Sequence, residues 1–170
     1  MEIQLSQALI RSFHTGDAES ITHYANNRNV SRNLTDMFPF PYQLSDAETF
    51  IDKVISTDPE QVFALVIDGE AVGGIGVHPK DGCYRSTALL GYWLGEPFWG
   101  RGIMTEAVRA ITAWAIPRFD LLRVEAGVFA WNTASARVLE KARYVLEGRH
   151  RKSVIKFGEV TDQLMYAYVV

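Results

Sequence analysis

The sequence contains a single cysteine, Cys83, among 170 residues. One thiol cannot close an internal disulfide, and it has no neighbours at metal-ligand spacing, so neither a disulfide-stapled fold nor a metal site is expected. The chain also has no run of 18 apolar residues, and its first residues lack a basic segment followed by an apolar one. These absences argue against a membrane span and a secretory leader, and they predict a cytoplasmic protein.

An excess of positive charge is also absent, since 17 Lys and Arg face 20 Asp and Glu for a net charge of −3. This balance argues against general nucleic-acid binding. The distribution is uneven: residues 1–60 hold nine acids against four Lys or Arg, and residues 101–170 hold seven against eleven. Either this is ordinary solvated surface, or the first part lies near a cationic ligand and the last part near an anionic one.

No repeat, low-complexity tract or linker interrupts the chain, so one domain over residues 1–170 is expected. Thr15 and Ser45 are placed as N-caps of two early helices. The predicted order is an opening strand or hairpin, two helices, a three-stranded antiparallel meander, a crossover helix, a strand, a short helix and two closing strands. This order predicts a mixed α/β sheet with one strand–helix–strand crossover. The predicted ranges are 3–13, 15–27, 45–56, 61–67, 71–79, 87–94, 103–117, 121–130, 132–142, 144–149 and 162–170.

The stretch "FWGRGIMTEAV", residues 98–108, places two glycines at the start of the crossover helix. The helix itself carries an apolar stripe of Met104, Val108, Ile111 and Ala115. Bare backbone at a helix N-terminus is typical of an anion-binding turn. A dinucleotide fingerprint requires a third glycine where Thr105 stands, and a P-loop requires a lysine that this turn lacks. A phosphate site remains, with a plain tight turn as the alternative.

Two longer stretches, "GYWLGEPFWGRGIMTEAV" and "RVEAGVFAWNTASARVLEKARYVLEG", together resemble the GNAT acetyltransferase superfamily, and within it the RimJ/RimL-like ribosomal-protein N-acetyltransferases. The likeness extends upstream to "DAESITHYANN" and "FPFPYQLSDAETFI" and so covers nearly the whole chain. It implies a central, mostly antiparallel twisted sheet of about seven strands flanked by about four helices. In that fold the sheet splays between the fourth and fifth strands.

The resemblance also implies acetyl-coenzyme A as cosubstrate. The turn expected to hold its pyrophosphate is Trp99, Gly100, Arg101, Gly102, Ile103, Met104 and Thr105. Trp99 stands where the family often has Gln or Arg, which matters little if the backbone does the binding. The pantetheine arm is expected beside Tyr92, Trp93, Leu94 and Asn132, and Ser135 and Arg137 complete the cofactor-binding set. Asn132 also suits the N-cap of its helix.

Acetyl transfer to an amine requires a neutral amine, a stabilised oxyanion and a donor to the leaving thiolate. Ser135 is the candidate thiolate donor, with a surface role as its alternative, and a backbone N–H near Trp93 and Leu94 is the candidate oxyanion donor. A related branch has a glutamate and a tyrosine at the positions of Gly127 and Leu139, so that catalytic pair is absent here. Glu125 lies on the same strand face as Gly127. It is either a base acting through water or a structural carboxylate paired with an arginine such as Arg123 or Arg137. His14 and His78 are weaker candidates.

The lack of a clear strong base favours a weakly basic acceptor. Deprotonating a lysine-like amine at pH 7 costs about 4.6 kcal/mol, whereas an α-amine costs about 1.1 kcal/mol. A protein N-terminus is therefore the expected acceptor. The alternatives are a small amine (aminoglycoside, polyamine or amino acid) and a coenzyme-A-binding module without catalysis. Phe38, Phe40 and Tyr42 are the expected pocket walls, unless they only cover the core.

Two further features of the sequence are a basic segment near its end and an arginine after the last predicted helix. The segment from Arg149 to Lys156, with Arg151 and Lys152, is basic enough to favour an acidic ribosomal or RNA surface, and a solvated loop is the alternative. The family usually has a glycine where this chain has Arg143, so that residue must tolerate a left-handed conformation or the helix must end differently. A homodimer would suit the family.

Overall fold

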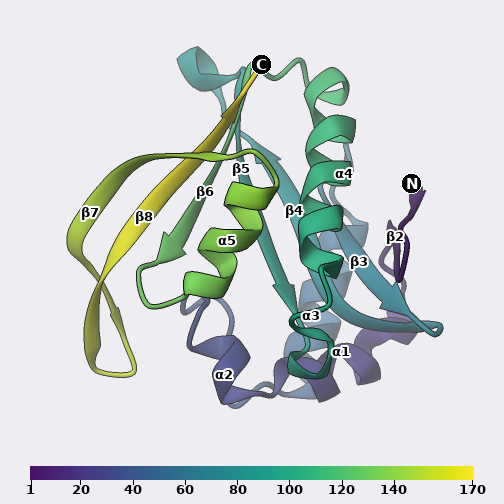
Figure 1. Cartoon of the computed structure of the whole chain (residues 1–170). Coiled ribbons are helices and arrows are strands. Elements are labelled where there is room, and N and C mark those ends of the chain that lie inside the picture. The colour runs from purple at the N-terminus through teal and green to yellow at the C-terminus, as the bar shows by residue number, and fades with distance from the viewer. The chain divides into compact units, whose positions relative to one another are not determined.

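The computed structural model describes residues 1–170, in which eight strands form one sheet of order β1-β2-β3-β4-β5-β6-β8-β7 (Figure 1). The strands are β1 Glu2–Gln4, β2 Leu9–Ser12, β3 Val62–Ile67, β4 Glu70–Pro79, β5 Thr87–Leu94, β6 Arg123–Phe129, β7 Val145–Lys156 and β8 Glu159–Val169. The helices are α1 Ala18–Ala25, α2 Arg28–Ser31, α3 Leu44–Ile55, α4 Ile103–Arg118 and α5 Thr133–Lys141. None of the helices combines the length and the apolar content that crossing a bilayer requires.

The mixed α/β fold is confirmed, with one strand and one helix more than expected. The opening segment forms a hairpin of two short strands, and α2 is an extra single turn. The crossover is β5–α4–β6, and β5 pairs with β6 in parallel over only Thr87–Leu89 and Arg123–Glu125. The expected fourth and fifth strands, here β5 and β6, therefore pair only at their beginnings, which agrees with the predicted splay.

The chain forms two compact units. The first comprises residues 1–76 and 92–103, and the second comprises residues 77–91 and 104–170. In the first unit, α1 buries Ala18, Ile21 and Ala25, while α3 buries Ala47, Ile51 and Val54, each at helical spacing. Both helices contribute to one apolar cluster with residues of β3 and β4. The core of this unit therefore follows directly from the apolar periodicity of its helices.

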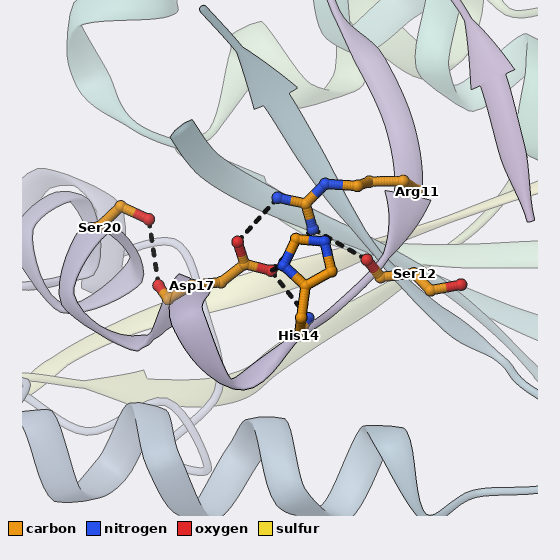
Figure 2. Close-up of polar contacts among 5 residues, drawn as sticks. All are labelled: Arg11, Ser12, His14, Asp17 and Ser20. Atoms are coloured by element: carbon orange, nitrogen blue, oxygen red, sulfur yellow. Dashed lines mark hydrogen bonds and ion pairs between the residues drawn. The ribbon is translucent and has the colours of Figure 1, made fainter. Parts of the chain in front are cut away.

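An ion pair fixes how the chain enters α1. The guanidinium of Arg11, on β2, donates to both carboxylate oxygens of Asp17 at 2.8 and 2.7 Å, and the His14 backbone N–H donates to the same carboxylate at 2.9 Å (Figure 2). The Ser20 hydroxyl donates to the Asp17 carbonyl oxygen at 3.0 Å. Residues 15–17 consequently form a 3-10 turn (η1), and α1 begins at Ala18. The predicted N-cap at Thr15 is wrong by two residues, because the N-cap of α1 is Asp17.

The start of α3 also differs from the prediction. Gln43, and not Ser45, precedes the first helical residue, and the Asp46 carboxylate accepts a hydrogen bond of 2.8 Å from the Gln43 backbone N–H. A hydrogen bond between an acidic side chain and the cap residue three positions before it is present, but it lies two residues earlier than predicted. The choice between two caps only two residues apart depends on the path of the loop that precedes the helix.

In the second unit the predicted stripe of α4 is confirmed, since Met104, Val108, Ile111 and Ala115 are all buried. The strand β6 alternates as expected, with Val124, Ala126 and Val128 buried. Strands β7 and β8 run antiparallel and form a longer hairpin than the two closing strands predicted. The predicted strand ended at residue 149, but β7 continues through the basic residues that follow. There Asp162 on β8 accepts hydrogen bonds from Arg149 Nε at 2.5 Å and from the Lys152 backbone N–H at 2.7 Å.

The end of α5 adopts the left-handed conformation that the family's usual glycine would supply. Arg143 has a φ of +70°, and the backbone N–H of the next residue, Tyr144, donates to the Leu139 carbonyl oxygen at 2.9 Å. The hydroxyl of Tyr144 lies 2.7 Å from that of Thr112 in the buried interior. The helix therefore ends as glycine-capped helices do, with an arginine in the strained position.

Candidate active site

The turn before α4 exposes its backbone in a conformation that suits an anion. Gly100 and Gly102 have φ angles of +76° and +82°, and Trp99 before them has an ordinary φ of −66°. A Cβ at either glycine would meet no atom within 4 Å, so open space lies beside the turn. Such alternation turns successive N–H groups toward one side, and the first N–H groups of α4, from Ile103 on, have no carbonyl partner within the helix. The turn can therefore hold a phosphate through backbone alone.

The predicted pyrophosphate residues divide by exposure. Trp99, Arg101 and both glycines are exposed, Thr105 is half-buried, and Ile103 and Met104 point into the interior. Ile103 and Met104 can therefore contribute only backbone groups to a ligand. The Trp99 indole N–H donates to the Leu94 carbonyl oxygen at 2.7 Å and fastens the turn to the end of β5.

At the end of β5 one backbone N–H points away from the neighbouring strand β4. A Cβ on Gly73 of β4 would lie 2.4 Å from the Trp93 carbonyl oxygen, so this carbonyl faces β4. Because a trans peptide directs its C=O and N–H oppositely, the Leu94 N–H points away from β4. The next N–H, of Gly95, turns back and donates to the Val72 carbonyl oxygen at 2.8 Å. The Leu94 N–H is thus the donor that the strand directs away from β4, next to the half-buried Tyr92 and Trp93.

In the second unit Asn132 occupies the predicted N-cap of α5, and its Oδ1 accepts from the Ser135 N–H at 3.2 Å. Because the cap uses the amide oxygen, Asn132 retains its NH₂ group to donate to a ligand. Ser135 is half-buried in the first turn of α5, and Arg137 is exposed two residues later. The structure thus brings Asn132 and Ser135 together at one helix end.

Glu125 is surrounded by cations. Its carboxylate forms an ion pair with Lys80, and Arg123 Nε donates to it at 3.1 Å while the same guanidinium also pairs with Glu147. Burial would raise the pKa of Glu125, but the hydrogen bonds from Lys80 and Arg123 outweigh it and hold the pKa below its usual 4.5. A carboxylate with a lowered pKa is a weak base. The geometry therefore favours the structural alternative, with Arg123 as the arginine and Lys80 as an unexpected second partner; the base role stays a prediction.

The expected pocket walls differ in exposure. Tyr42 is 5% exposed and belongs to the core of the first unit, and burial raises its pKa to about 12, helped by Asp46. Phe38 is partly buried, with its ring centroid 4.9 Å from that of Tyr42 and 5.3 Å from that of Trp93. Phe40 is exposed. The burial of Tyr42 favours the alternative that it covers the core, and the ring of Phe38 contacts a strand residue predicted to line the cofactor.

Several polar residues near the turn were missed by sequence reasoning. Glu96, just before the turn, accepts amide hydrogen bonds from Asn27 at 2.6 Å and Asn29 at 2.9 Å. Gln7, in the turn between β1 and β2, is hydrogen-bonded to Arg101. No local pattern in the sequence joins residues so far apart, and only the pairing of β1 and β2 at one end of the chain sets Gln7 in place.

The remaining candidate residues have surroundings that point to no particular catalytic role. His14 is exposed beside Asp17, and His78 is exposed on β4. In the basic segment Arg149 is paired with Asp162, and Lys156 is 5% exposed, so these two residues add little to a basic surface. Two shallow hollows in the first unit, of about 370 and 310 Å³, contain none of the predicted site residues.

Comparisons with known proteins agree with this geometry. Residues 7–145 match the family described as acetyltransferase (GNAT) domain. "Probable N-acetyltransferase YjcK" of Bacillus subtilis is 50% identical over 81 residues, which are 48% of this chain and 45% of that protein. YdaF of the same organism, named provisionally as a ribosomal N-acetyltransferase, is 32% identical over 103 residues, which are 61% of this chain and 56% of that protein. The matches thus span about half the length of these two curated relatives.

A solved structure is similar over the whole chain. RimL, described as a ribosomal L7/L12 α-N-protein acetyltransferase in complex with coenzyme A, aligns with a TM-score of 0.87 at 20% identity, covering 100% of this chain and 98% of RimL. At that identity the likeness establishes the fold. The family resemblance drawn from the glycine turn and its flanking motifs is confirmed.

Proposed function

This chain belongs to the acetyltransferase (GNAT) domain family, and on that premise we propose that it transfers an acetyl group from acetyl-coenzyme A to the α-amine of a protein N-terminus. One observation carries the proposal. Gly100 and Gly102 take positive φ angles with open space beside them, at the head of a 16-residue helix. A pyrophosphate fits such a turn, because a backbone cradle and a helix N-terminus both favour an anion.

The proposed reaction is a direct transfer of the acetyl group from the thioester to the amine. The amine nitrogen attacks the carbonyl carbon, a C–N bond forms, and the C–S bond breaks. The proton that the nitrogen loses balances the one that the thiolate takes up. We assign the Leu94 N–H to the developing oxyanion and the Ser135 hydroxyl to the leaving sulfur, since a fixed donor near each developing charge lowers the barrier. Asn132 is the proposed donor to the pantetheine arm.

The α-amine is favoured as acceptor by the weakness of the available base. Glu125 is held by two cations and is poorly suited to take a proton from a lysine-like ammonium group. An α-amine is neutral often enough near pH 7 to react with little help, as its pKa lies close to 7.8. The names of YdaF and RimL point to ribosomal proteins as acceptors for those proteins, and a protein N-terminus is the corresponding proposal here.

Thiol release from acetyl-coenzyme A tests the proposal with two acceptor pools, peptides differing in their free N-terminal residue and common small amines. We expect release with peptides, in amounts that depend on the first residue. Release with small amines alone would replace the protein acceptor by a small-molecule one. Binding of coenzyme A without release from either pool would make the chain a binding module.

The role of Ser135 is tested in the same assay. Ser135→Ala is expected to lower kcat at an unchanged KM for acetyl-coenzyme A. The matched control is Ser153→Ala, which removes a hydroxyl that bonds only the His150 carbonyl oxygen in the β7–β8 hairpin and should leave kcat unchanged. Equal kcat values for wild type and Ser135→Ala would remove Ser135 from the mechanism.

A further inference from the structure

Gln7 makes three hydrogen bonds to a single residue 94 positions away. Its Nε2 donates to the Arg101 carbonyl oxygen at 3.1 Å, and its Oε1 accepts from Arg101 Nε at 3.3 Å and from Nη2 at 3.2 Å. Arg101 lies between the two glycines of the turn, and Gln7 belongs to the turn between β1 and β2. One side chain thus holds both the backbone and the head group of the central residue of the turn.

The backbone contact fixes the direction of the next N–H. The peptide between Arg101 and Gly102 is planar and trans, so its N–H points opposite to its carbonyl. When Gln7 holds the Arg101 carbonyl, the Gly102 N–H is turned away from Gln7. Gly102 has a φ of +82°, a region in which glycine moves freely, and nothing lies within 4 Å of its missing Cβ. The hydrogen bond from Gln7 therefore restrains the plane of this peptide.

The contact with the guanidinium restrains the positive charge of Arg101. Arg101 is exposed, and its guanidinium is restrained by the Gln7 Oε1 atom and by the Phe98 ring, whose centroid lies 5.8 Å from Cζ. Ordering a free arginine on binding carries an entropic cost, which a restraint already present in the free protein reduces. Gln7 accepts from the guanidinium through a neutral oxygen, and the positive charge therefore stays available to an anion.

We propose that Gln7 is a positioning residue that holds the Arg101–Gly102 peptide and the Arg101 guanidinium ready for the phosphates of the cosubstrate. The inference rests on the proposed function for the identity of the ligand. Gln7 touches no reacting atom, so its loss acts on the binding of the phosphates and not on the acetyl transfer. Removing it should raise KM and Kd for coenzyme-A ligands about five- to tenfold and leave kcat unchanged.

The test compares Gln7→Met with Gln4→Met. Methionine keeps the length of the side chain and removes its hydrogen bonds. The Gln4 amide donates to the Leu5 and Ala8 carbonyl oxygens, at 2.9 and 3.2 Å, within the same hairpin, and so Gln4→Met controls for general damage to this hairpin. Each protein is assayed with acetyl-coenzyme A and with acetyl-pantetheine, which carries no phosphate, and coenzyme A binding is measured by calorimetry.

For Gln7→Met we expect a higher KM for acetyl-coenzyme A, an unchanged kcat, and an unchanged kcat/KM for acetyl-pantetheine. Gln4→Met should match the wild type in all three. An equal fall in kcat/KM for both substrates, or an equal effect of the two variants, would overturn the positioning role. The calorimetric Kd keeps the inference separate from the proposed function: a wild type that binds coenzyme A without releasing thiol contradicts the function, and a Kd unchanged in Gln7→Met contradicts the inference.

Discussion

Arg11 and Asp17 meet in a bidentate ion pair in which both side chains are largely buried, at 11% and 6% exposure. The two residues lie on either side of a sharp change of direction, from the strand β2 into the 3-10 turn before α1 (Figure 2). The Asp17 carboxylate also accepts the His14 N–H, so it satisfies a backbone donor as well as the arginine. The pair therefore fixes where the first helix starts.

Asp17→Asn is expected to lower the free energy of unfolding by about 3 kcal/mol at pH 7, because it leaves the Arg11 charge buried without its partner. The loss should shrink in acid. Burial would raise the pKa of Asp17, but the hydrogen bonds from Arg11 and His14 lower it below 3.8. A lowered pKa contributes stability in full above the unfolded-state value, and that stability is lost as the pH falls through the folded-state pKa. Urea unfolding of both proteins between pH 7 and pH 3 measures the difference.

Asp46→Asn is the matched control for this prediction. Asp46 accepts the Gln43 N–H at the start of α3 in the same way, but it is half-buried and no arginine is bonded to it. Its substitution should cost less than about 1 kcal/mol. Equal losses from the two variants would mean that the buried arginine adds nothing, and that capping alone explains the effect of Asp17.

Glu125→Gln separates the two roles that the sequence left open. If Glu125 is a structural carboxylate, removing its charge should lower the free energy of unfolding by about 1–2 kcal/mol. The reason is that Lys80 and Arg123 then lose a partner that is only 15% exposed. The kcat for thiol release should stay within about threefold of the wild type. A general base would instead lose about a hundredfold or more. Glu147→Gln is the control, because Glu147 is the more exposed partner of Arg123. It should lower the free energy of unfolding by less than Glu125→Gln does.

The sequence predicted those parts of the fold that depend on local periodicity. The stripe on α4 from Met104 to Ala115 and the alternation on β6 are short-range patterns, and both hold in the structure. The starts of α1 and α3 shifted because each is set by a contact with the incoming chain: Arg11 with Asp17 at α1, and Gln43 with Asp46 at α3. A strong cap residue alone does not contain that information.

The same division applies to the site. The glycine turn was predictable because Gly100 and Gly102 mark a conformation that other residues rarely adopt. Spacing placed Glu125 on the face of β6 that also carries Gly127, but could not reveal Lys80, which reaches it from the end of another strand. Gln7 had no local signal at all. Residues that act through a long-range contact become visible only once the strands are paired.

Gly102→Ala is expected to weaken coenzyme A binding at least tenfold by calorimetry. The side chain itself meets open space, so the effect arises from the φ of +82°, which costs an alanine about 1 kcal/mol and tends to rotate the cradle. Gly82→Ala is the matched control, since Gly82 has a φ of +62° and open space beside it in the 3-10 turn Gly82–Tyr84, which carries no predicted site residue. It should lose similar stability and bind coenzyme A normally. Similar binding by the two variants would contradict a backbone cradle at Gly102.

Arg143→Gly is expected to raise the free energy of unfolding by about 1 kcal/mol. Arg143 is exposed and holds a φ of +70° at the end of α5, a conformation that costs a side-chain-bearing residue about 1–2 kcal/mol and costs glycine almost nothing. The greater freedom of glycine in the unfolded chain offsets part of this benefit. Lys141→Gly, at the exposed last residue of the helix, keeps helical geometry and should destabilise instead. Urea unfolding compares the three proteins, and a clear fall in stability for Arg143→Gly would mean that the arginine side chain supplies more than its strained backbone costs.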